Sequence, residues 1–159
     1  AGGVQVINMQ PFVLEGGSIE SDGKGTLLTT VECLSSQNRN EYLQKEELEA
    51  YLKDVFGFER ILWLENGYLA GDDTDSHIDT LARFCSEDTI AYVQCKDESD
   101  EHFEELQAME QELQAFRQAD GKPYRLIADG GPCGMGGRTS SCHLCQFFDY
   151  QRGCVVTLL

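Results

Sequence analysis

The chain has 159 residues and a strong excess of acid, with 12 Lys and Arg against 28 Asp and Glu and a formal net charge of −16. This balance excludes nucleic acid as a partner, because phosphate contacts need clustered cations, while 41% apolar residues are typical of a globular chain. A membrane-spanning helix is excluded as well, because no run of about 18 apolar residues is present.

The N-terminal part of the chain predicts one β-β-α-β unit. Strands are expected at Phe12–Glu15 and Thr26–Val31, which are rich in apolar and β-branched residues and separated by glycine-rich turns. A helix is expected over Leu48–Phe56, where apolar residues recur at helical spacing, with Gly57 as its C-cap. Ile61–Leu64 completes the unit as a third strand.

The same order of elements then recurs. Strands are expected at Leu81–Cys85 and Thr89–Val93, a helix at about Glu101–Ala119, and a further strand at Arg125–Ala128. Equivalent elements lie roughly 60 residues apart, a period typical of arrays and propellers. Because two units alone would leave sheet edges exposed, we expect the parent chain to hold more copies.

The composition changes at Asp129, where a run of glycine begins and the remaining cysteines crowd together. We therefore divide the chain into a domain at residues 1–128 and an aberrant Gly/Cys-rich tail at residues 129–159. Within the tail, Cys142-His143-Leu144-Cys145 suggests zinc, with Cys133 and Cys154 as further ligands. The wide spacing of those further ligands is not that of common zinc modules, so no metal is expected.

The cysteine count bears on the compartment. Seven is an odd number, which fits poorly with a secreted disulfide scaffold. Residues Ala1–Gly17 also lack the basic start and apolar stretch of a signal peptide. We therefore expect a cytoplasmic protein.

Two segments are candidates for chemistry. The first, Gly71–Asp79, holds four carboxylates and one His, and in extended backbone His77 and Asp79 would point to the same face. The second is a Glu-Gly-Gly turn that presents the carboxylate of Glu15. Taken alone, the first segment also fits a polar loop with Asp side chains in turns, and the second an ordinary turn. An EF-hand is excluded because its Gly and its final Glu are missing.

In combination, several stretches of residues 4–128 resemble the agmatine deiminase and bacterial peptidyl-arginine deiminase family, part of the guanidine-modifying pentein superfamily. The matching stretches are Leu14–Thr30, Asn38–Asn40, Ile61–Leu64, Gly71–Phe84 and Thr89–Val93. The resemblance implies an α/β fold, a partial α/β-propeller (pentein) in which this chain supplies about two of five β-β-α-β modules. Family members are much longer, so the resemblance also implies an internal fragment.

The resemblance also implies roles for individual residues. His77 matches the general acid/base of the family, and Glu15 matches the acidic residue that supports it. Asp79 matches the carboxylate that grips the guanidinium, and Asp73 matches a position at the far end of the substrate site. Ser76 stands where the family usually has Gly, a change that could crowd the backbone beside the catalytic His.

The implied activity is hydrolysis of a small cationic guanidine, with agmatine giving N-carbamoylputrescine and ammonia in putrescine biosynthesis. In this family a thiolate attacks the central carbon while a His transfers protons, and no cofactor or metal is implied. Two alternatives stay open: deimination of peptidyl arginine, and a non-catalytic acidic domain that binds guanidines or polyamines.

The nucleophilic Cys of the family, in a stretch similar to Gly-Gly-x-x-His-Cys, has no counterpart in this chain. Cys33 and Cys85 fit buried small hydrophobic residues instead, so we expect the chain to be inactive alone. Codons for Leu144–Leu158, read one nucleotide later, permit the family-like sequence YANFLIINGAVLLP. This predicts a reading-frame shift near Asp129, which would make the tail out-of-frame translation.

Overall fold

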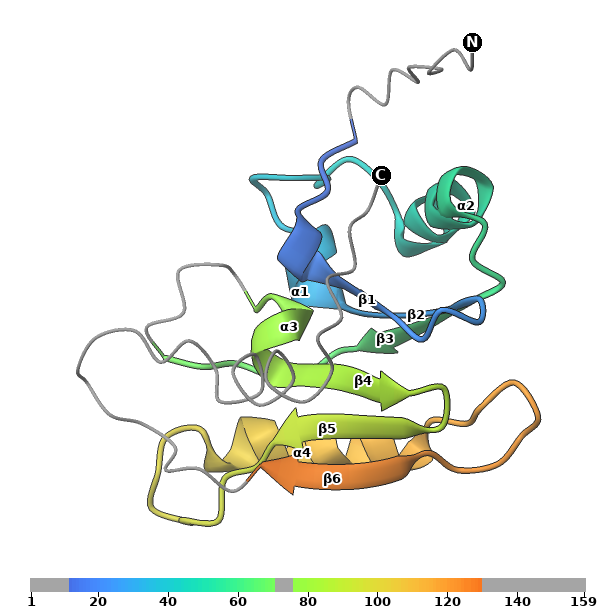
Figure 1. Cartoon of the computed structure of the whole chain (residues 1–159). Coiled ribbons are helices and arrows are strands. Elements are labelled where there is room, and N and C mark those ends of the chain that lie inside the picture. Colours follow the sequence, from blue (N-terminus) through green and yellow to red (C-terminus); the bar gives the residue numbers. More distant parts are fainter. Residues whose placement is uncertain (1–11, 71–75, 130–159) are drawn as a thin grey trace, which may run out of the picture.

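Residues 12–70 and 76–129 are described by the computed structural model, and they form two units with the same order of elements (Figure 1). The first unit consists of β1 (Ile19–Ser21), β2 (Thr26–Thr30), α2 (Lys45–Phe56) and β3 (Arg60–Leu64). The second consists of β4 (Ala82–Ser86), β5 (Thr89–Val93), α4 (Phe103–Ala115) and β6 (Arg125–Asp129). The β-β-α-β repeat expected from the sequence is therefore confirmed.

Each unit builds a three-stranded sheet with the same strand pairing. The first two strands of each sheet are antiparallel and the last two are parallel. Parallel neighbours need a crossover connection, and α2 and α4 provide it in the two units. The registers also correspond, because Thr26 lies opposite Arg60 in one sheet and Thr89 opposite Arg125 in the other.

Three one-turn helices connect the units or flank the strands. They are the 3-10 turn η1 (Gly16–Ser18), α1 (Val31–Leu34) and α3 (Ile78–Leu81). Helix α3 contacts η1 and strands of both sheets, and it lies between the two sheets in Figure 1. The segment that carries His77 and Asp79 is therefore held at the junction of the two modules.

The ends of the two long helices follow from local chemistry. Helix α2 begins at Lys45, earlier than expected, because the N–H of Gln44 donates to the Glu47 carboxylate at 2.8 Å. It ends at Phe56, and Gly57 is its C-cap, as expected, in the left-handed conformation with φ 74°. Helix α4 ends at Ala115, earlier than expected, because Phe116 is extended and Arg117 then pairs with Pro123 in an isolated bridge.

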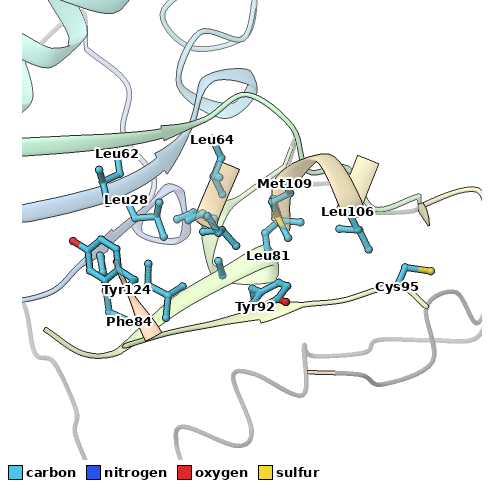
Figure 2. Packing of buried hydrophobic residues seen from close by; sticks show 14 residues of the cluster. Leu28, Leu62, Leu64, Leu81, Phe84, Tyr92, Cys95, Leu106, Met109 and Tyr124 are labelled. Carbon is cyan, nitrogen blue, oxygen red and sulfur yellow. The ribbon is translucent and has the colours of Figure 1, made fainter. Parts of the chain in front are cut away.

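The core divides along the two faces of β2, where successive side chains point in opposite directions. Leu27 packs with Trp63 beneath α2, while Leu28 joins a second cluster with residues of β4, β5 and α4. Figure 2 shows Leu28 and Leu62 beside Phe84 and Tyr124 in this second cluster. Because both leucines of β2 are fully buried, the first sheet is fixed against the second module as well as against its own helix.

A carboxylate that is largely but not fully buried joins the two modules. Glu20 on β1 accepts the backbone N–H of Phe84 on β4 at 3.1 Å and lies 3.4 Å from Nε of Arg83. Burial raises the pKa of Glu20, although Arg83 and the N–H of Phe84 oppose that rise. The two sheets are thus joined edge to edge through the polar contacts of Glu20 as well as through the apolar core.

One expectation about the N-terminal segment needs correction. The strand expected at Phe12–Glu15 does not form; the first strand is Ile19–Ser21, because the glycine pair after Glu15 makes the 3-10 turn first.

Residues 129–159, apart from Asp129, lie outside the described residues. Across residues 12–70 and 76–129, none of the helices is both long and apolar enough to cross a bilayer.

Candidate active site

The Glu-Gly-Gly turn fixes the first residue of the site. Glu15 is extended at φ −103°, and its carbonyl oxygen accepts both the backbone N–H of Ser18 at 3.0 Å and the Ser18 hydroxyl at 2.6 Å. The Ser18 side chain is buried, so the turn is closed from inside the fold. This closure directs the Glu15 carboxylate away from the sheet and toward α3.

His77 and Asp79 lie at the start of α3, not on extended backbone as we expected. His77 is the residue before the helix and Asp79 lies in its first turn. The hydroxyl of Thr80 donates to the carbonyl of His77 at 2.8 Å, and the hydroxyl of Thr30 donates to the carbonyl of Ser76 at 2.8 Å. Both side chains nevertheless reach Gly17 from this turn, and the hydrogen bond from Thr30 anchors the segment to β2.

Ser76 explains why this position suits glycine. Its φ of 59° is left-handed, a conformation that costs most side chains about 1–2 kcal/mol. The serine is buried, and its hydroxyl donates to Oε2 of Glu32 at 2.9 Å. A hydrogen bond to a carboxylate thus offsets the strain of the left-handed backbone at Ser76.

Glu15, His77 and Asp79 converge around Gly17. Nε2 of His77 lies 2.5 Å from Oε2 of Glu15. A Cβ placed on Gly17 would lie 2.5 Å from Nδ1 of His77 and 2.8 Å from Oδ2 of Asp79. The imidazole therefore presents one nitrogen to Glu15 and the other to the space that it shares with Asp79.

Arg39 completes the cluster, and sequence reasoning missed it. The composition of Asn38-Arg39-Asn40 predicts a polar loop in which side chains bind the backbone. Asn40 follows this prediction, because its amide contacts the backbone of Val13 and Leu34 at 2.9 Å. Arg39 instead donates through Nε and Nη2 to Oε2 of Glu15, at 3.2 and 2.6 Å. The sequence did offer one signal for this role, because Arg39 is a cation within the Asn38–Asn40 stretch that resembles the family.

The electrostatics of the cluster keep Glu15 ionised. Hydrogen bonds first from Arg39 and then from His77 hold the pKa of Glu15 below its usual value. Because a carboxylate only accepts hydrogen bonds, Nε2 of His77 is the protonated nitrogen in the neutral ring. Nδ1 is then left with a lone pair on the Asp79 side, placed to accept a proton there.

Asp73 lies outside the described residues. Ala70, the last described residue before it, is bound by His102. Although the acidic helix beside it suggests a surface position, His102 is buried; its Nε2 accepts the N–H of Ala70 at 2.8 Å, and its Nδ1 contacts Asp100 at 2.5 Å. The backbone of Ala70 is thus held by the residue that precedes α4.

One group among the described residues offers a set of metal ligands. Ligand atoms of Glu15, Cys33 and His77 lie within 4.8 Å of one another, and this donor set is of the kind that zinc accepts. The guanidinium of Arg39, however, lies 2.6 Å from the same Glu15 oxygen and would repel a divalent cation. The geometry therefore favours an ion-paired carboxylate over a metal ligand.

The chain is similar to a known protein family and to individual relatives. Residues 1–136 match the family model described as Porphyromonas-type peptidyl-arginine deiminase. The agmatine deiminase of Pseudomonas fluorescens is 39% identical over 122 residues, which cover 77% of this chain and 33% of that protein. The chain thus spans about a third of the length of the relatives that it matches.

Solved structures agree with this match. A Cys-to-Ser variant of the C. jejuni agmatine deiminase with substrate bound has a TM-score of 0.69 and 46% identity, covering 80% of this chain and 37% of that one. The agmatine deiminase of Enterococcus faecalis has a TM-score of 0.75 and 34% identity, covering 84% and 36%. Together with the repeated modules and the cluster around Gly17, these matches show that the chain belongs to the Porphyromonas-type peptidyl-arginine deiminase family.

Proposed function

We propose that this chain carries the proton-transfer and guanidinium-binding part of a deiminase site, with agmatine as the ligand. The observation that carries the proposal is the convergence around Gly17, where one point lies within 3.0 Å of both His77 Nδ1 and the Asp79 carboxylate. The agmatine deiminases among the relatives favour agmatine over other guanidines.

The chemistry of the ligand suits this arrangement. A guanidinium is planar and carries five N–H donors in a fixed fork, so it binds best to carboxylates placed at its edge. Asp79 would accept two of these donors, and His77 would face the nitrogen that departs. Because Gly17 has no side chain, its backbone can lie close to both groups; a Cβ there would lie 2.5 Å from Nδ1 of His77 and 2.8 Å from Oδ2 of Asp79.

In the proposed reaction, a thiolate attacks the central guanidinium carbon. His77, doubly protonated at that stage, donates the Nδ1 proton to one amino group, which leaves as ammonia. Water then attacks the covalent intermediate while Nδ1 accepts one of its protons. The remaining hydroxyl proton passes to solvent as the C=O bond forms and the thiolate departs, which leaves the ureido product. Glu15 holds Nε2 throughout. Because the family's nucleophile motif has no counterpart in the sequence, we propose that residues 1–159 bind the ligand without turnover.

A second candidate is arginine within a peptide, which would become citrulline. The family description, peptidyl-arginine deiminase, favours it. The head group and its contacts would be the same for both ligands, so they differ only in what surrounds the rest of the substrate. A non-catalytic domain that binds guanidines would make the same contacts. It would differ in showing no turnover even in a longer protein that supplies the thiolate.

The proposal is tested by calorimetric titration of agmatine into the chain 1–159. Asp79→Asn should weaken binding by about tenfold or more, because a hydrogen bond to a charged partner contributes about 1.5–3 kcal/mol. The matched control is Asp54→Asn, which removes the same charge from the exposed side of α2. Equal affinity in the two variants would contradict the proposal.

Two further titrations sort the candidates. Putrescine has no guanidinium and should bind at least about tenfold more weakly than agmatine, because it lacks the planar fork. An arginine-containing peptide that binds better than agmatine would favour the second candidate. Ammonia release should be absent with residues 1–159 and present in a frame-restored, longer protein.

We also propose that the domain ends near residue 128 and that the tail is out-of-frame translation in a protein of the cytoplasm, where putrescine is made. The odd number of cysteines supports the compartment, and the family-like shifted reading supports the frame shift. The nucleotide sequence beyond codon 128 tests the second point. A continuous in-frame match to the family, without an inserted or deleted base, would contradict it.

A further inference from the structure

The side chain of Arg39 is nearly buried, whereas the carboxylate of Glu15 beside it is exposed to solvent. The Arg39 side chain is 8% exposed, whereas that of Glu15 is 44% exposed. The guanidinium is held from the other side by the carbonyl of Cys33 at 3.4 Å and the hydroxyl of Ser36 at 3.1 Å, both of which accept from Nη1. Arg39 is therefore the fixed member of the pair, and Glu15 is the member that it places.

The neighbouring residue, Asn40, binds the segment that carries Glu15. Asn40 is fully buried and binds both the N–H and the carbonyl of Val13 at 2.9 Å. Two consecutive residues of one loop thus hold the backbone two positions before Glu15 and the side chain of Glu15 itself. This double contact sets the height and the rotation of the carboxylate relative to α3.

We propose that Arg39 is a positioning residue of this site: it holds one oxygen of Glu15 against Nε2–H of His77 and so leaves Nδ1 facing Asp79. One oxygen of Glu15, Oε2, contacts both neighbouring side chains: Nη2 of Arg39 at 2.6 Å and Nε2 of His77 at 2.5 Å. Arg39 acts through Glu15 and need not touch a ligand. The inference rests on the proposed function only in one respect, namely that Nδ1 transfers protons during the reaction.

Lysine would not replace this arginine. The guanidinium places two N–H groups on one oxygen while a third reaches the Cys33 carbonyl and the Ser36 hydroxyl. An ammonium has no planar fork and cannot keep those directions at once. The cation also favours the ionised form of Glu15, the form that can accept the imidazole proton.

The test is nitrogen NMR of the histidine rings in the chain 1–159 at neutral pH, where the two neutral tautomers give distinct signals. The His77 signals are assigned by their loss in His77→Gln. In the unaltered chain we expect the proton of His77 on Nε2. In Arg39→Gln we expect the ratio of the Nε2–H to the Nδ1–H form to fall about tenfold, because the exposed Glu15 carboxylate can turn into water.

Two companions complete the comparison. Arg39→Lys keeps the charge and should give an intermediate ratio, while Arg125→Gln, which removes an exposed charge from β6, should leave the ratio unchanged. Carbon NMR of the Glu15 carboxyl should show its titration midpoint rising in Arg39→Gln. An unchanged ratio and an unchanged Glu15 midpoint in a folded Arg39→Gln would overturn the inference.

The result stays decisive if the variants do not fold. The unaltered chain alone overturns the inference if His77 carries its proton on Nδ1, or if Glu15 titrates at or above its ordinary value. Failure of the proposed function gives a different pattern. Agmatine would then leave every histidine signal in place, while the dependence of the His77 tautomer on Arg39 would remain.

Discussion

Replacing Gly17 by Ala is the sharpest single perturbation of this site. The added Cβ would lie 2.5 Å from Nδ1 of His77 and 2.8 and 3.0 Å from the Asp79 oxygens, against an ordinary contact of at least 3.4 Å. The imidazole must therefore retreat by about 0.9 Å (3.4 less 2.5) or the turn must move. Overpacking of this kind costs about 1–3 kcal/mol of stability.

The effect on the site should exceed the effect on the fold. A displacement of about 1 Å can cost a reaction about a hundredfold, and for binding we expect agmatine affinity to fall at least about tenfold. Gly16→Ala is the matched control, because a Cβ there would meet nothing within 4 Å. Calorimetry with agmatine and urea unfolding measure the two effects. Agmatine affinities within twofold of each other in the two variants would refute the reasoning.

Two further predictions concern stability. Ser76→Gly should lower the free energy of unfolding by about 1 kcal/mol, because the lost bond to Glu32 outweighs the relieved left-handed strain; in a Glu32→Ala background the loss should vanish, and an equal loss there would contradict this account. Glu20 has a raised pKa, so the stability that it contributes is full at low pH and is lost as pH rises through the pKa in the folded state. Glu20→Gln should therefore gain stability over the unaltered chain between pH 5 and pH 7.5, measured by urea unfolding; an unchanged or opposite difference would count against the buried carboxylate.

The sequence was sufficient for features that depend on local pattern. The period of the apolar residues predicted both modules, and the spacing of Gly57 predicted the end of α2. The resemblance predicted that Glu15, His77 and Asp79 would serve one site, and the structure brings them together around Gly17. No local pattern could place Asp73, which lies outside the described residues.

Features that depend on distant contacts were missed. Arg39 lies 24 positions from Glu15 in the chain, so only the fold brings its guanidinium to that carboxylate. The acidic sequence around His102 indicates a surface position, but His102 is buried because it binds Ala70, which lies 32 positions earlier in the chain. The Phe12–Glu15 segment has the composition of a strand, but the closure of the turn by Ser18 and the grip of Asn40 on Val13 hold it outside both sheets.

The central claim is that a guanidinium head lies between the imidazole of His77 and the carboxylate of Asp79. Titration of agmatine into the chain 1–159, observed on the ring nitrogens of His77, tests it most directly. The account predicts a saturable change in the Nδ1 signal that Asp79→Asn weakens and Asp54→Asn does not. An Nδ1 signal that stays constant at saturating agmatine, or that changes equally with putrescine, would contradict it.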